Sequence, residues 1–150
     1  MKKFKFSLDS VLSYKEQVLE ALQNEHAAIM LEVREQEEVL EAVWQEYRAC
    51  NAEYSQRKAE GMAITDAMVY QNGLRVLEQD IQRETDKLEE LRRKEEKKRQ
   101  EVVDAKIDTS SIEKLREHKL EDYNKAVQKD EEKLIDEFVS SAHARANIGA

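Results

Sequence analysis

The sequence predicts an all-α protein made of two long helices that fold back on each other as an antiparallel coiled-coil hairpin. The chain has no proline and only three glycines in 150 residues, and 39% of its residues are charged. A β or α/β fold needs many tight turns, which this composition does not supply. Apolar residues recur at alternating steps of three and four, with one short interruption. We therefore expect residues 1–150 to form a single hairpin.

The first helix is expected over about residues 7–58. Ser7 can cap it, Asp9 lies in its first turn, and Phe6 and Val11 can pack across the helix start as a hydrophobic staple. Positions that are predicted to face the other helix are called seam positions. Only three seam positions of the first helix are polar. The seam positions are Leu8, Leu12, Lys15, Leu19, Leu22, His26, Ile29, Val33, Gln36, Leu40, Val43, Tyr47, Cys50 and Tyr54.

The pattern is interrupted at residues 59–66, which we expect to form the turn. Gly61 is suited to end a helix, and Thr65 or Asp66 can cap the next one. The second helix is then expected over about residues 67–145. Its seam positions are Tyr70, Leu74, Leu77, Ile81, Glu84, Leu88, Leu91, Glu95, Lys98, Val102, Ala105, Thr109 and Ile112.

Two irregularities lie in the second helix. Residues 92–101 contain no apolar side chain, so lysine stems must cover the seam there. After Ile112 the phase of the apolar residues slips, and Ser110 and Glu113 have the spacing of a capping box. The helix therefore either restarts near residues 108–112 or passes through with a kink. A continuous helix is favoured because no proline or glycine lies between Leu74 and Ile148.

The two helices differ in length, which predicts an unpaired end. With the turn centred near residue 63, Leu8 pairs with a residue close to 118, and the second helix continues to about Ala144. At ~1.5 Å per residue the overhang is roughly 40 Å. An exposed apolar stripe normally marks a contact surface for another chain. The stripe consists of Leu120, Tyr123, Val127, Leu134, Ile135 and Phe138.

The residue types give no catalytic or ligand-binding constellation. A net charge of −8 disfavours duplex nucleic acid, whose binding depends on phosphate neutralisation. Cys50 is the lone cysteine, which fits a reducing cytosol. His118 and Asp122 have a metal-compatible spacing on one helix, but zinc needs three or four converging ligands. We expect no enzyme activity, cofactor, metal or small-molecule substrate.

An aromatic cluster lies near the turn end of the first helix. It consists of Trp44, Tyr47 and Tyr54, with Cys50 between them. Tyr47 and Tyr54 are seam positions, whereas Trp44 is one step off the seam and should be partly exposed. The cluster is either an interface or simple packing at the hairpin edge, because composition alone does not separate the two.

The ends of the chain resemble the FliJ family of bacterial flagellar type III export. Residues 4–16 read Phe-Lys-Phe-Ser-Leu-Asp-Ser-Val-Leu-Ser-Tyr-Lys-Glu. Family members often begin Phe-x-Phe-x-Leu, followed by Val-Leu-x-Tyr-(Lys/Arg)-Glu. Residues 112–117, Tyr123 and residues 132–137 are similar to the family's C-terminal part. The resemblance covers nearly the whole chain.

This resemblance implies a non-enzymatic coiled-coil hairpin similar to the stalk (gamma) subunit of rotary ATPases. It implies insertion into the hexameric flagellar export ATPase, promotion of its assembly and activity, contact with the export-gate membrane protein, and handling of export chaperones. The location implied is cytoplasmic, at the membrane face of the flagellar basal body. The expected ATPase-ring contacts are Phe4, Phe6, Leu8, Val11, Leu120, Tyr123, Val127, Leu134 and Phe138.

The gate contact carries over less completely. The expected gate-facing residues are Trp44, Tyr47, Tyr70 and Leu77. We aligned Tyr70 and Gln71 with the Tyr-Gln pair of enterobacterial members, whose gate-contact residues are Phe, Leu, Ala and His. The corresponding residues here are Gly73, Leu77, Asp80 and Glu84, and Leu77 alone agrees.

Two other functions remain open at this point. The first is the analogous stalk of a virulence-type secretion ATPase, which shares the architecture. The second is a generic coiled-coil scaffold or homodimerising adaptor, whose seam would pair between chains instead of within one. Cross-links that join only residues of different chains would favour the adaptor.

Overall fold

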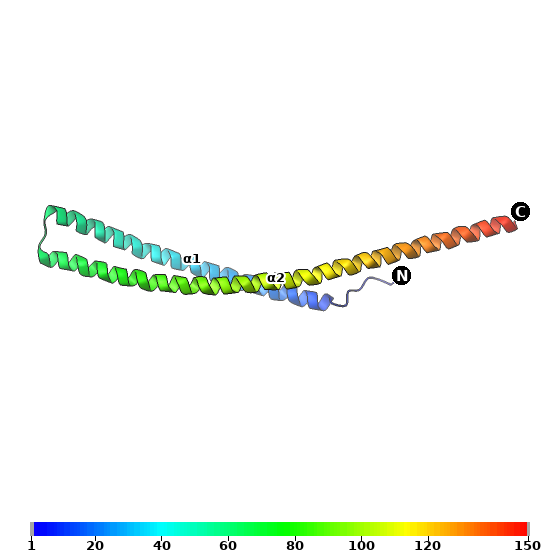
Figure 1. Ribbon diagram of the computed structural model, residues 1–150, viewed down its shortest axis with the longest axis horizontal. Coiled ribbons are helices and arrows are strands. Elements are labelled where there is room, and N and C mark those ends of the chain that lie inside the picture. The colour runs from blue at the N-terminus through cyan, green and yellow to red at the C-terminus, as the bar shows by residue number, and fades with distance from the viewer. Residues whose placement is uncertain (1, 150) are drawn as a thin grey trace. The chain divides into compact units, whose positions relative to one another are not determined.

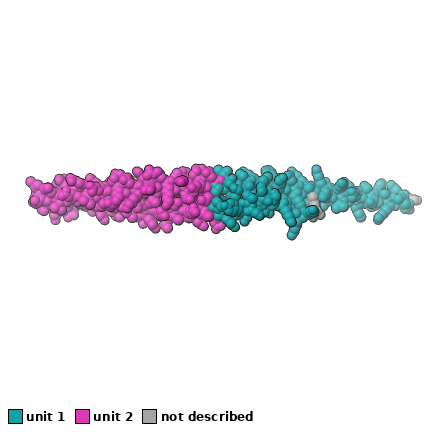
Figure 2. Space-filling view, turned by 90° about the horizontal axis from the view of Figure 1, so that it is seen from below, with its two compact units in different colours: residues 1–19, 105–150 teal, residues 20–104 magenta. Residues whose placement is uncertain are grey.

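The computed structural model describes residues 2–149, so the first and last positions of the expected hairpin lie outside the described residues. It contains two helices, α1 (Asp9–Glu60) and α2 (Ile64–Ile148), of 52 and 85 residues (Figure 1). Residues 2–149 contain no strand, which confirms the all-α prediction. The chain divides into two compact units, one of residues 20–104 and one of residues 2–19 with 105–149 (Figure 2).

The turn between the helices is shorter than the expected residues 59–66. Only residues 61–63 are non-helical there, and Gly61 has a φ of 92°. That left-handed conformation is accessible to glycine without a Cβ clash, and it stops α1 abruptly. α2 therefore begins at Ile64, before the expected caps, and Asp66 lies in its first turn. At the other end α1 begins at Asp9, because Ser7 and Leu8 form a turn.

The predicted seam is confirmed position by position. Every seam position of both helices is buried or half-buried. The most buried apolar side chains of residues 20–104 are Ile29, Tyr54, Ile81 and Leu88. α2 passes through residues 108–112 without interruption, so the helix does not restart where the apolar phase slips.

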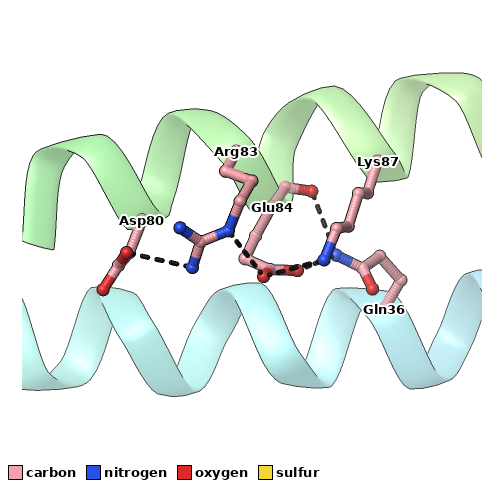
Figure 3. A network of polar contacts seen from close by, with 5 residues as sticks. All are labelled: Gln36, Asp80, Arg83, Glu84 and Lys87. Atoms are coloured by element: carbon pink, nitrogen blue, oxygen red, sulfur yellow. Dashed lines mark hydrogen bonds and ion pairs between the residues drawn. The ribbon is translucent and has the colours of Figure 1, made fainter.

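Polar seam positions of α1 face polar seam positions of α2 in the unit of residues 20–104. His26 Nε2 lies 2.7 Å from Glu95 Oε1. The Gln36 side-chain amide donates to Glu84 Oε2 at 2.6 Å and to the Glu84 carbonyl oxygen at 3.1 Å (Figure 3). The hydrogen bond from Gln36, with help from Lys87, lowers the pKa of the Glu84 carboxyl below its ordinary value. Each buried polar group thus has a partner on the other helix.

The same matching occurs in the unit that carries the termini. Lys15 Nζ lies 2.6 Å from Asp108 Oδ2, and the Thr109 hydroxyl lies 3.5 Å from the Lys15 carbonyl oxygen. Asp9 pairs with Arg116 at 3.4 Å. Since higher positions in α1 pair with lower positions in α2, the two helices run antiparallel within this unit.

Ion pairs connect the apolar-free stretch 92–101 of α2 to α1. Lys98 Nζ lies 2.8 Å from Glu25 on α1 and 2.7 Å from Glu101 one turn along α2. These two carboxylates raise the pKa of Lys98 above its ordinary value. Arg92 pairs across the helices with Glu37 at 3.3 Å. Ion pairs therefore replace apolar contacts where the seam lacks apolar side chains.

Candidate interaction surfaces

Residues 2–6, which we call the N-terminal arm, lie against α2 in non-helical conformation. The Tyr123 hydroxyl donates to the Lys2 carbonyl oxygen at 2.6 Å, and the Phe4 ring packs on the Tyr123 ring at 5.5 Å between centroids. The Arg116 guanidinium lies 5.6 Å from the Phe4 ring centroid, in cation–π geometry. Phe6 is buried. The arm therefore continues the pairing of the two chain segments beyond the start of α1.

A basic groove runs along the arm. It has a volume of about 1070 Å³ and is open to solvent. Four lysines line it, together with the aromatic rings of the arm and of α2, and none of the four forms an ion pair within residues 2–149. The lining residues are Lys2, Lys3, Phe4, Lys5, Phe6, Ser7, Lys119 and Tyr123.

The end of α2 carries the exposed apolar surface expected from the sequence. We call residues 128–148 the tail. Every one of its residues is exposed, with Leu134 at 66% and Phe138 at 75%. Ile135 and Val139 are also exposed. The tail is roughly 30 Å long at ~1.5 Å per residue, shorter than the expected 40 Å, because the arm pairs with α2 beyond residue 118.

The residues expected to contact the ATPase ring differ in accessibility. Phe6 is buried, and the four residues Phe4, Leu120, Tyr123 and Val127 are half-buried. Leu8 is half-buried as well, whereas Val11 is exposed. Leu134 and Phe138 on the tail are fully available to a partner. The structure thus brings the arm residues together with Tyr123 and leaves the two tail residues apart from them.

The aromatic cluster lies near the turn in the unit of residues 20–104. Trp44 is 38% exposed and meets Tyr47 edge to face at 5.8 Å. Tyr54 and Tyr70 stack at 5.4 Å, and the Tyr70 hydroxyl donates to Glu53 at 2.9 Å. Burial and that hydrogen bond raise the pKa of the Tyr70 hydroxyl above its ordinary value.

Of the expected gate-facing residues, Trp44 is the accessible one. Tyr47, Tyr70 and Leu77 are half-buried seam residues. Cations cover the stacked tyrosines, with Lys58 Nζ 4.2 Å from the Tyr54 ring centroid. Edge packing therefore accounts for most of this cluster.

The sequence reasoning missed a second apolar surface beside the turn. It is formed by four apolar residues in the first part of α2 that lie outside the seam, and all four are exposed. The signal was available, because these side chains are apolar at positions outside the three-and-four series. They are Ile64, Met68, Val69 and Val76.

Neither metal-binding clusters nor membrane-spanning helices were found in the part of the chain that the structure describes. Within residues 2–149, no group of three or more His, Cys, Asp or Glu side chains is placed to hold a metal ion. Over the same residues, neither helix has the length and apolarity needed to cross a membrane.

The fold and its surfaces define a two-helix coiled-coil protein with an unpaired helical end. The family described as flagellar FliJ protein matches residues 4–147. Since this match covers nearly the whole chain, the protein belongs to the FliJ family and is associated with flagellar protein export. Comparison with curated proteins and with solved structures gave no match.

Proposed function

We propose that the protein is a non-enzymatic stalk of the flagellar export ATPase. Its tail enters the hexameric ATPase ring, promotes ring assembly and raises turnover. The observation that carries this proposal is the tail itself, an unpaired helix whose apolar face at Leu134 and Phe138 is open to a partner. Family membership supports the flagellar system over the virulence-type one.

The region beside the turn links this ATPase to the export gate. Trp44 and the off-seam residues Ile64, Met68 and Val69 offer exposed apolar side chains near the turn. Aromatic and large aliphatic side chains of this kind are the usual anchors of protein interfaces. The protein works at the cytoplasmic face of the membrane in contact with the gate, and it also escorts export chaperones.

Titration of the protein into purified export ATPase tests the ring contact. We expect turnover and hexamer formation to rise with added protein, and removal of residues 128–150 to abolish both effects. This truncation keeps Tyr123, and with it the binding site of the arm. Ile107→Asp is the matched control, because Ile107 is an exposed apolar residue of α2 outside the tail. Activation by the truncated chain would contradict the proposal.

Binding to the cytoplasmic domain of the gate protein tests the second contact. We expect Met68→Asp to weaken capture of that domain while leaving ATPase activation intact. Leu115→Asp is the control, since Leu115 is exposed on α2 but belongs to the unit that carries the termini. Equal capture by the Met68 variant and the control would remove this surface from the proposal.

A further inference from the structure

The tail lacks the contacts that stabilise the rest of α2. An isolated helix of about twenty residues is only marginally stable in water, because most helical stability in proteins comes from packing of an apolar face. All residues from 128 to 148 are exposed, and five large apolar side chains are among them. This face therefore needs an occupant when the protein is alone.

The tail has a three-and-four series of its own, which begins at Val127 and is one residue out of phase with the seam that ends at Ile112. Beyond Val127 the alternating steps of four and three reach one acid, one base, three apolar residues and one serine. When two copies of this stretch are laid antiparallel about Phe138, each position of the series falls opposite another position of the series or within one residue of it. The opposed pairs are Val127 with Ile148, Glu131 with Arg145, Leu134 with Ser141, and Phe138 with its own copy.

We propose that the tail pairs with the tail of a second copy of this chain, as a symmetric antiparallel dimer. The two-fold axis passes beside Phe138, and the Glu131–Arg145 pair then occurs twice. A large side chain, Leu134, faces a small one, Ser141, as close packing requires. A parallel pairing would instead place Glu131 against Glu131 and Arg145 against Arg145, which is unfavourable.

The ends of the paired tails also fit. The arm of each chain covers α2 as far as Tyr123. In the antiparallel arrangement Ile148 of the second copy reaches Val127, the first position of the series. The arm and the second tail thus occupy successive stretches of α2. Because ring entry would use the same tail, dimer formation and ring entry exclude each other.

Charge reversal in the full-length chain tests the dimer. Sedimentation equilibrium of the wild type should show a monomer–dimer equilibrium. Arg145→Glu and Glu131→Arg should each weaken dimerisation at least about tenfold, because each reverses the charge of two symmetry-related pairs. An equimolar mixture of these two variants should dimerise again, since every pair in that heterodimer has opposite charges.

Two further variants separate tail pairing from other causes. Phe138→Glu should abolish the dimer, because it places two carboxylates at the two-fold axis. Ile107→Glu, the same kind of change at an exposed position of α2 outside the tail, should leave the dimer unchanged. Circular dichroism of each variant checks that the hairpin remains folded.

A wild-type protein that stays monomeric at millimolar concentration would overturn the proposal. A mixture of the charge-reversed variants that stays monomeric would overturn it as well. Neither result bears on ATPase activation, which is measured with the ring present. Conversely, a dimer that fails to activate the ATPase would remove the stalk function and leave tail pairing standing.

Discussion

Two leucines of α2 separate the stability of the hairpin from the proposed binding function. Leu88 is 4% exposed in the unit of residues 20–104, whereas Leu134 is 66% exposed on the tail. Replacement of a buried leucine by alanine removes burial of its side chain and leaves a cavity. Leu88 packs in a seam between only two helices, so we expect Leu88→Ala to lie at the low end of the range, about 2–3 kcal/mol.

Leu134→Ala is the matched change, because the residue type and the helix are the same. The intrinsic helix propensities of leucine and alanine differ by only a few tenths of a kcal/mol, so we expect almost no loss of stability. For a chain of this size, about 2–3 kcal/mol at Leu88 corresponds to a fall in Tm of roughly 5–10 °C. Dilute protein should be used, so that tail pairing does not contribute.

The two assays should give opposite rankings. Thermal unfolding followed by circular dichroism should report a large effect for Leu88→Ala and almost none for Leu134→Ala. Activation of the export ATPase, measured well below the Tm of both variants, should fall for Leu134→Ala and be retained for Leu88→Ala. The reasoning is refuted if the two variants unfold at the same temperature, or if Leu88→Ala alone loses activation.

Three further predictions concern the turn, the buried acid and the arm. Gly61→Ala should destabilise the hairpin by about 1–2 kcal/mol, because Gly61 has a left-handed φ. Gly73→Ala within α2 should instead stabilise the hairpin by about 0.5–1 kcal/mol, because alanine favours a helix and nothing lies near the added Cβ. A lower Tm for both variants would contradict this. The pKa of Glu84 is lowered by Gln36, so its carboxylate stabilises the folded state above the ordinary pKa, and this stabilisation disappears as the pH falls through the lowered pKa. The stability difference between wild type and Glu84→Gln should therefore shrink between pH 7 and pH 3 in urea unfolding, and a constant difference would argue against it. Tyr123→Phe removes a hydrogen bond of about 1 kcal/mol to the arm, so tryptic cleavage within the arm should be about fivefold faster; an unchanged rate would mean that this bond does not hold the arm.

The seam could be predicted from the sequence because it depends on a single periodicity. A helix places every third or fourth residue on one face, so apolar spacing alone located the buried positions of both helices. Even the polar seam positions Lys15, His26 and Gln36 were found by their phase. Their partners were not predicted, because the register of two helices depends on the length of the turn, and Gly61 makes that turn tight.

The arm could not be predicted from the same signal. Residues 2–6 are too few to show a period, and their contacts with Tyr123 join segments far apart in the sequence. The phase slip after Ile112 also concealed which side chains of α2 remain accessible. Consequently the length of the unpaired tail was overestimated, while the exposed apolar residues Leu134 and Phe138 were correctly placed in it.

The matched polar positions of α1 and α2 also determine how the chain finds its fold. If two copies aligned side by side in the same direction, Glu84 would meet Glu84 and Lys15 would meet Lys15, and both encounters repel. Within one chain, a three-residue connection keeps the complementary half at a high local concentration. Hairpin closure is therefore a unimolecular step whose rate does not change with dilution, and newly made chains can fold without waiting to meet one another.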